Sequence, residues 1–307
     1  MGSPCVLRVA GADIEPAQVR RAMAMAAAEV ARIEAKYSRY RADSIVSRIN
    51  AGAGRTARHG LDAETAGLLH FADRLHRESG GLFDITSGVL RRVWDFRTAV
   101  CPTAEAVART LELVDWRAVE FDGKRIRLPK PGMELDFGGF GKEYAADRAA
   151  TLLRDAGLSH GYVNLGGDIR LLGPMPDGAP WHLGIAHPRR PGEVICAVEL
   201  SHGALATSGD YERYFDAGGR RYCHILDPRS GWPVEHWQSA TVLAPACLAA
   251  GALTTLAMLE QAGAPALLDG QGVAWILIDA QGRMHRGGPQ SAPSGSSALQ
   301  PASRRAS

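Results

Sequence analysis

The sequence lacks the cysteine patterns that mark metal sites and disulfide frameworks. It contains no C-x-x-C pair, and its cysteines are odd in number and widely scattered. Neither a zinc site nor a set of structural disulfides is therefore expected, and a reducing compartment fits this usage best. The five cysteines are Cys5, Cys101, Cys196, Cys223 and Cys247.

The sequence also lacks an export signal and a long uninterrupted apolar run. Its first residues, M-G-S-P-C-V-L-R-V, show no basic region followed by an apolar stretch, so no secretory signal is visible. Residues 240–259 form the longest apolar run, but Pro245, Gly251 and several threonines interrupt it too often for a membrane span. We expect a cytoplasmic protein without a membrane span; an exported protein would fit if the N-terminus were truncated.

An excess of one charge is absent as well. The chain has 35 basic and 33 acidic residues, a net charge of +2, and no basic stripe with interleaved aromatic residues. Nucleic acid is therefore not expected as a partner. The 307 residues allow one large domain or two ordinary ones, and an apolar content of 46% is enough for a sizeable core.

Helical and strand-like patterns are mixed irregularly along the chain. Apolar residues recur at helical spacing in residues 15–37, 61–79, 103–114 and 246–261. Strand-like patterns occur in residues 5–9, 181–185, 194–200, 239–244 and 272–279. The mixture predicts an α+β fold of mostly antiparallel sheets flanked by helices. We expect one domain over residues 1–285 and a disordered, low-complexity tail over residues 286–307.

Local signals mark several boundaries. Asp62 is expected to cap the helix over residues 61–79. Asp122-Gly123 predicts the turn of a hairpin over residues 119–128. A second hairpin, formed by residues 206–215 and 221–233 and rich in hydroxyl groups, Asp and His, is expected to turn at residues 217–219. Gly166-Gly167 interrupts an apolar strand, which suggests either a bulge or the close approach of another backbone or a ligand.

The stretch from Glu134 to Ala150 has the most informative pattern. Leu135 and Phe137 alternate with polar residues as at the end of a strand, a glycine loop follows, and helical spacing begins at Lys142. A strand, a glycine loop and a helix start favour anion binding by backbone N–H groups, best suited to phosphate. The dinucleotide and P-loop fingerprints both fail here, and a tight turn without a ligand is the alternative.

Several segments, taken in order, resemble the ApbE family, the FAD:protein FMN transferases. The resemblance covers nearly the whole chain except the tail, and it implies an ApbE-like, T-fold-like architecture. The segments are M-G-S at the start, Y-S-R-Y-R-A-D-S-I-V-S-R-I-N, G-L-F-D-I-T-S-G, L-D-F-G-G-F-G-K-E-Y-A-A-D, V-N-L-G-G-D-I, A-T-S-G-D-Y-E-R-Y-F and H-I-L-D-P-R-S-G-W-P.

The resemblance implies a reaction on FAD. Members of this family bind FAD, cleave its pyrophosphate and attach FMN through a phosphoester to a Thr or Ser of a target flavoprotein, so that AMP leaves. Such phosphoryl transfer needs neutralised phosphate charge, usually by Mg²⁺, a base near the acceptor hydroxyl, and in-line placement. Two other functions stay open: a catalytically silent FAD-binding protein, and an FAD pyrophosphatase that releases FMN and AMP.

The resemblance also implies roles for individual residues. His224 matches the histidine proposed as the base, and a histidine pKa near neutrality suits proton removal; a hydrogen-bonded hairpin histidine is the alternative. Thr207, Ser208 and Asp210 could support the same cleft or have only structural roles. The residues expected to bind FAD are Met1, Tyr40, Leu82, Phe83, Asp84, Asp136, Gly138, Gly139, Lys142, Asn164, Gly166, Gly167 and Asp168.

One departure from the family pattern concerns the metal. The family has a helix that opens A-D-x-x-x-T, whose Asp and Thr bind Mg²⁺ together with a carbonyl of the glycine loop. Here Thr255 and Gly139 match, but Gly251 stands where the Asp is expected, and Mg²⁺ favours carboxylate oxygen. Glu143 stands where the family usually has Gly, and it offers either a replacement carboxylate or a favourable partner for the helix dipole.

Overall fold

The structure is a computed structural model that describes residues 4–11 and 15–289. Its centre is a seven-stranded sheet in which all neighbouring strands are antiparallel, which confirms the predicted α+β class. In spatial order the strands are β1 (Cys5–Val9), β5 (Gly161–Leu165), β6 (Asp168–Gly173), β9 (Ala204–Gly209), β12 (Trp237–Ala244), β13 (Ala274–Asp279) and β14 (Met284–Gly287).

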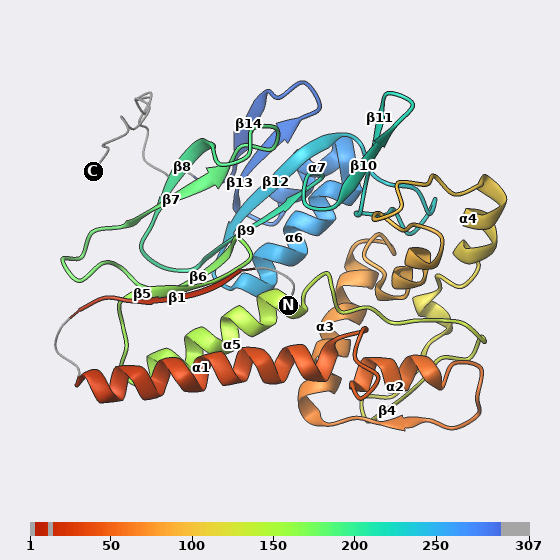
Figure 1. Cartoon of the computed structure of the whole chain (residues 1–307), viewed down its shortest axis with the longest axis horizontal. Helices are drawn as coiled ribbons and strands as arrows, with labels where there is room; N and C mark the ends of the chain where they lie inside the picture. Colours follow the sequence, from red (N-terminus) through yellow and green to blue (C-terminus); the bar gives the residue numbers. More distant parts are fainter. Residues whose placement is uncertain (1–3, 12–14, 290–307) are drawn as a thin grey trace.

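Helices cover one face of this sheet. Helix α5 (Gly141–Asp155) packs against β5 and β6, and α6 (Cys247–Glu260) packs against β9 and β12. The long helix α1 (Pro16–Tyr37) lies along α5, and Figure 1 shows the two side by side. The buried face of α5 consists mainly of alanines, whose small side chains let neighbouring helices approach closely.

A two-stranded hairpin covers part of the other face. It consists of β7 (Trp181–Ala186) and β8 (Val194–Leu200). Trp181, Leu183 and Ile185 alternate with exposed residues along β7, as expected for a strand with one buried face. They pack with Ile169 and Leu205 of the large sheet, so β6 and β9 are buried on both faces.

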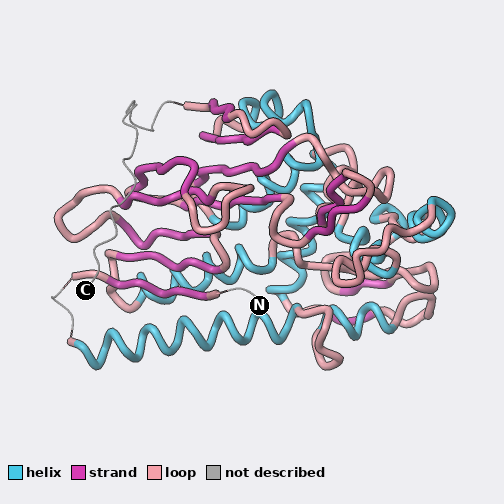
Figure 2. The backbone as a smooth tube through the Cα atoms, turned by 45° about the horizontal axis from the view of Figure 1, so that its top comes forward, coloured by secondary structure: helices cyan, strands magenta, loops and turns pink. Residues whose placement is uncertain are grey.

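Most of the elements between α1 and α5 form a mostly helical region at one end of the sheet, seen on the right of Figure 1. Figure 2 shows it beside the strands of the large sheet. Asp62 caps α3 by accepting a hydrogen bond from the Thr65 N–H at 2.8 Å, as predicted. The elements are α2 (Ile45–Ala51), β2 (His59–Gly60), α3 (Ala63–Glu78), η1 (Ile85–Arg92), α4 (Ala104–Leu111), η2 (Trp116–Ala118), β3 (Glu120–Phe121) and β4 (Arg125–Arg127).

Two hairpins turn where the sequence predicts. Strands β3 and β4 pair across Asp122-Gly123, and Gly123 has the positive φ that favours glycine. Strands β10 (Tyr214–Ala217) and β11 (Arg220–Cys223) pair across Gly218-Gly219. The latter hairpin is shorter than predicted, because residues 206–209 belong to β9 in the large sheet.

Two local predictions are wrong. Residues 135–137 do not form a strand: the Leu135 N–H and carbonyl bond to the side chain of Asn50, at 2.7 and 3.0 Å, instead of to a neighbouring strand. The alternation there reflects the burial of Leu135 and Phe137 in the core. Gly166-Gly167 is not a bulge but the turn between β5 and β6, with φ of 62° and 96°, which suits a type I′ hairpin.

The C-terminal region differs from the prediction in its boundaries. Helix α7 (Ala264–Gly270), which follows the short turn η3 (Gln261–Gly263), was not predicted. Strand β14 includes Arg286 and Gly287, two residues beyond the expected domain end at 285, and residues 290–307 of the expected tail lie outside the described residues. Within the described part of the chain no helix has the length and hydropathy to cross a membrane, and no cysteines are joined by a disulfide.

Candidate active site

The glycine loop before α5 is closed by its own hydrogen bonds. The Gly138 N–H donates to the Asp136 carboxylate at 2.8 Å, and the Phe140 and Gly141 N–H groups donate to the Phe137 carbonyl at 3.2 and 2.7 Å. The expectation that these amides are available to phosphate is therefore wrong for those three residues. The ring of Phe83 lies against Gly139, where an added Cβ would be 3.5 Å from it.

A buried ion pair joins the start of α5 to the β5–β6 turn. Lys142 Nζ lies 2.6 Å from Asp168 Oδ2, and the other oxygen of Asp168 accepts the Thr207 N–H at 3.0 Å. Burial alone would lower the pKa of Lys142, but the charges of Asp168 and Glu143 outweigh it and raise that pKa to about 12. Lys142 therefore stays positively charged beside the site.

The Glu143 carboxyl group lies next to this pair, between α5 and α6. The residue is 6% exposed, and its Oε2 has no hydrogen-bond partner among the described residues. Burial, followed by the charge of Asp168, raises its pKa to about 8. Its side chain fills the space beside Gly251, where an added Cβ would lie 2.4 Å from the Glu143 Cγ.

His224 follows β11 and is buried among cations. Its N–H donates to the Arg213 carbonyl at 3.0 Å, and its ring Nδ1 has no hydrogen-bond partner among the described residues. Burial lowers its pKa to about 3, and the charges of Arg213, Arg91 and Lys142 act in the same direction. The near-neutral pKa expected from the sequence is therefore wrong for the polypeptide alone, because burial and three positive charges disfavour the imidazolium.

Asp136 belongs to a network of arginines. Its Oδ2 lies 3.2 Å from Arg39 Nη1 and 3.4 Å from Arg91 Nε. Burial would raise its pKa, but Arg91 and Arg39 outweigh that effect and hold it below its usual value. Arg39 also bonds to the Gly88 carbonyl at 2.8 Å and to Glu134 at 2.6 Å, so Asp136 is fixed as an anion by the protein itself.

The expected FAD-binding residues at positions 82–84 are held in the interior. Leu82 and Phe83 are buried in the core. The Asp84 carboxylate accepts hydrogen bonds from the Thr86 N–H and hydroxyl, at 2.7 and 2.6 Å, and from the Trp116 N–H at 3.1 Å. These contacts account for the position of Asp84 without a ligand.

Other predicted residues differ in their surroundings. Tyr40 is 78% exposed, and the Arg39 guanidinium lies over its ring, 6.0 Å from the ring centre. Asn164 closes the β5–β6 turn by accepting the Gly167 N–H at 2.9 Å, and the Gly166 N–H donates to the Pro4 carbonyl at 2.9 Å. An added Cβ at Gly167 would meet no atom within 4 Å, so the turn, and not a close approach at that residue, accounts for this glycine. Met1 lies outside the described residues.

The face of α6 turned toward α5 presents Gly251 and Thr255, one helical turn apart. The adjacent Thr254 is buried and bonds to the Ser208 hydroxyl and the Gly251 carbonyl, both at 2.9 Å. Asp147 holds the start of α6 against α5 by accepting the Cys247 and Leu248 N–H groups, each at 2.9 Å. Asp210, which the sequence placed near the same cleft, forms an ion pair in which its Oδ1 lies 2.6 Å from Arg189 Nη1.

The structure therefore brings Lys142, Asp168 and Gly139 together near the start of α5. The charge of Lys142 also contributes to the lowered pKa of His224. Sequence reasoning missed Arg91 and Arg213: the charges of both act on His224, and the charge of Arg91 also acts on Asp136. Arg213 lies within the matched segment A-T-S-G-D-Y-E-R-Y-F, and Arg91 lies three residues beyond G-L-F-D-I-T-S-G. The sequence does not show that both arginines act on His224, because Arg91 comes from η1 and Arg213 from the loop before β10.

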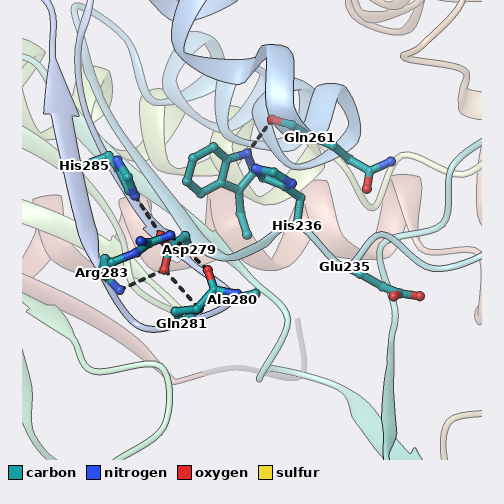
Figure 3. Close-up of a pocket in the computed structure, with 9 residues that line it drawn as sticks. Glu235, His236, Gln261, Asp279, Ala280, Gln281, Arg283 and His285 are labelled. Carbon is teal, nitrogen blue, oxygen red and sulfur yellow. Dashed lines mark hydrogen bonds and ion pairs between the residues drawn. The ribbon is translucent and has the colours of Figure 1, made fainter.

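Two cavities have no predicted site residue in their linings. The first, of about 420 Å³, lies beside Trp237 and Asp279, and Figure 3 shows Asp279 held by Arg283 and His285. Its carboxylate is 2.8 Å from Arg283 Nε and 2.9 Å from His285 Nε2. The second, of about 680 Å³, is lined by residues including His70, Trp116 and Phe121.

Comparison with known proteins supports one family. Residues 1–277 match the ApbE family. A protein of Haemophilus influenzae named FAD:protein FMN transferase is 32% identical over 234 residues, which cover 73% of this chain and 68% of that protein. A protein of the same name from Vibrio cholerae is 33% identical over 237 residues, covering 74% and 70%.

Solved structures agree with this match along almost the whole chain. The crystal structure of the ApbE protein of Thermotoga maritima has a TM-score of 0.84 and 31% identity, and the match covers 93% of this chain and 94% of that one. The apo form of the Pseudomonas stutzeri flavinyl transferase ApbE has a TM-score of 0.80 and 30% identity, with 94% and 92% covered. Sequence, fold and the arrangement of the matched segments agree: the chain belongs to the ApbE family.

Proposed function

We propose that this chain transfers FMN from FAD to a Thr or Ser hydroxyl of a target flavoprotein and releases AMP. Its relatives from Haemophilus influenzae and Vibrio cholerae are named FAD:protein FMN transferases. The observation that carries the proposal to this chain is the buried, neutral His224 among Lys142, Arg91 and Arg213. A diphosphate and a hydroxyl group are reactants that such a site can serve.

The reaction exchanges the phosphoanhydride bond of FAD for a phosphoester bond to the acceptor. A bond forms between the acceptor oxygen and the phosphorus of the FMN half, and the bond from that phosphorus to the bridging oxygen breaks. AMP leaves with the bridging oxygen, and the hydroxyl proton is transferred to a base. Positioning and charge stabilisation supply most of the catalysis in reactions of this type, so the cations around His224 have a direct role in holding the diphosphate.

His224 is the group that we assign to proton removal. Its lowered pKa keeps the imidazole neutral at physiological pH, so a ring nitrogen can accept a proton. A bound diphosphate would place negative charge beside the same cations, and this charge would offset them and raise the pKa of His224. The base would thus strengthen only when the substrate is in place.

The donor set around the start of α5 fits a hard divalent cation. The Gly139 carbonyl and the Thr255 hydroxyl would hold Mg²⁺, and the unpartnered, buried Oε2 of Glu143 adds an oxygen to the same region. When bound, Mg²⁺ would neutralise part of the diphosphate charge. Lys142 supplies a further positive charge, and its pair with Asp168 fixes where that charge lies.

The proposal is tested by following both products. The chain is incubated with FAD, Mg²⁺ and a flavoprotein domain that carries a Thr acceptor, beside the same domain with that Thr replaced by Ala. We expect covalent flavin fluorescence on the Thr domain alone, with one AMP released per flavin attached, and loss of both with His224→Gln. AMP without labelling would show a pyrophosphatase, and FAD binding without either product a silent binding protein; each result would refute the proposal.

A further inference from the structure

Glu143 and Gly251 are in contact between two helices. These residues are 108 positions apart, on α5 and α6, yet the space beside the Gly251 Cα is occupied by the side chain of Glu143. An added Cβ at Gly251 would lie 2.4 Å from Cγ, 2.9 Å from Cδ and 3.1 Å from Oε1 of Glu143. Glu143 thus places its carboxylate where a short side chain at position 251 would otherwise project.

The Glu143 carboxyl group lies beside one cation and one anion. Lys142 Nζ lies 2.6 Å from Asp168 and 3.9 Å from Glu143, so one ammonium group faces two carboxyl groups. Glu143 is 6% exposed, and its Oε2 has no hydrogen-bond partner among the described residues. Leaving a buried carboxyl oxygen without a partner costs free energy. A divalent cation would give this oxygen a partner and would balance a second ionised carboxyl group beside Asp168.

The neighbouring residues offer further oxygen atoms. Thr255 lies one turn beyond Gly251 on the same face of α6, and the carbonyl of Gly139 lies just before the start of α5. Asp147 bonds to two N–H groups at the start of α6 and thereby holds the two helices together at this point. Oxygen ligands on a fixed frame are the environment that Mg²⁺ requires.

We propose that Glu143 is the carboxylate ligand of the divalent cation in this chain, delivered from α5 into the space that Gly251 leaves open on α6. The inference rests on the proposed function for the diphosphate that completes the cation's coordination. It assigns to Glu143 a role in metal binding instead of a role as a partner of the helix dipole. The two residues then act together: Glu143 supplies the carboxylate, and Gly251 leaves the space that this carboxylate needs.

Mn²⁺ provides a direct probe, because its free form is counted by electron paramagnetic resonance without any reaction. The full chain is titrated with Mn²⁺ in the presence of FAD, and FAD binding is measured separately by flavin fluorescence in EDTA. We expect Glu143→Gln to weaken Mn²⁺ binding by at least about tenfold while FAD binding in EDTA is unchanged. Glu199→Gln, on β8, is the matched control and should behave as the wild type.

A reciprocal exchange tests the geometry and guards against a variant that only disturbs folding. Glu143→Gly alone should lose Mn²⁺ affinity, and Glu143→Gly combined with Gly251→Asp should regain most of it, because the carboxylate then enters the same space from α6. Circular dichroism and FAD binding in EDTA identify a variant that has not folded. Mn²⁺ binding by the double variant at wild-type strength would support the proposal even if Glu143→Gln were unstable.

Three results would overturn the inference. They are an unchanged Mn²⁺ affinity in Glu143→Gln, failure of the folded double variant to regain affinity, and a wild-type chain that binds FAD but no Mn²⁺. Failure of the wild-type chain to bind FAD in EDTA would instead refute the proposed function. The Mn²⁺ titration therefore tests the inference, and the FAD titration in EDTA tests the proposed function.

Discussion

Lowering the pH should reduce the free energy of unfolding, because His224 is held neutral in the folded state. The pKa of this histidine is lowered to about 3 by burial and by Arg213 and Arg91, from the ordinary value of 6.5 that applies in the unfolded chain. Between these values the unfolded state binds the proton and the folded state does not, so stability falls as the pH falls. Each pH unit well inside this window costs up to about 1.4 kcal/mol.

The expected size follows from the two pKa values. Between pH 6 and pH 4, His224 should remove roughly 2.5 kcal/mol from the free energy of unfolding. A His224→Gln variant cannot bind that proton and should lose this part of the pH dependence. Urea unfolding followed by tryptophan fluorescence at both pH values, for both proteins, isolates the contribution of His224, because the other titrating groups are common to both.

An exposed residue without an ionisable side chain serves as the control. Met25 is exposed on α1, so Met25→Gln should leave the pH dependence as in the wild type. If His224→Gln loses stability between pH 6 and pH 4 as steeply as the wild type, the imidazole is not held neutral by its surroundings. The charges of Arg213, Arg91 and Lys142 would then not lower the pKa of His224 as proposed.

Three further substitutions test how the site is held. Asp147→Ala removes the two hydrogen bonds to the start of α6 and should cost about 1–2 kcal/mol of stability. Asp84→Ala leaves three buried donors without their acceptor and should cost about 2–4 kcal/mol. Gly161→Ala would place a Cβ 2.1 Å from the Arg8 carbonyl oxygen and should cost at least about 2 kcal/mol by separating β1 from β5. Urea denaturation at pH 7 measures all three.

Alanine at the exposed Glu193 is the reference for these measurements, with an expected change within about 0.5 kcal/mol. A neutral result for Asp147→Ala would mean that α6 is held by packing alone. For Asp84→Ala, wild-type stability would show that the carboxylate is not needed for the loop. An unaffected Gly161→Ala would indicate that β1 can shift without cost.

The sequence predicted features that depend on neighbouring residues. The Asp62 cap and the Asp122-Gly123 turn are set by a few adjacent positions, and both are confirmed. Leu135 and Phe137 show where this reasoning fails: alternating burial has the same pattern whether the backbone bonds to a strand or, as here, to the side chain of Asn50. The pattern reports which side chains are buried and not what the backbone pairs with.

Features that depend on distant residues could not be predicted in the same way. Strand β1 pairs with β5, which lies about 150 residues later in the chain, and no local pattern gives that order. The pKa of His224 depends on Arg91 and Arg213, which come from separate elements. His224 entered the predicted site through the family resemblance, and Lys142 through its place after the glycine loop. The charged groups around both depend on the folded chain.

The contact between the two helices also means that positions 143 and 251 cannot vary independently. A side chain at position 251 would collide with Glu143 where it now lies, so it must displace Glu143 or meet a shorter residue at position 143. Substitutions at the two positions are therefore expected to be non-additive, although 107 residues separate them along the chain.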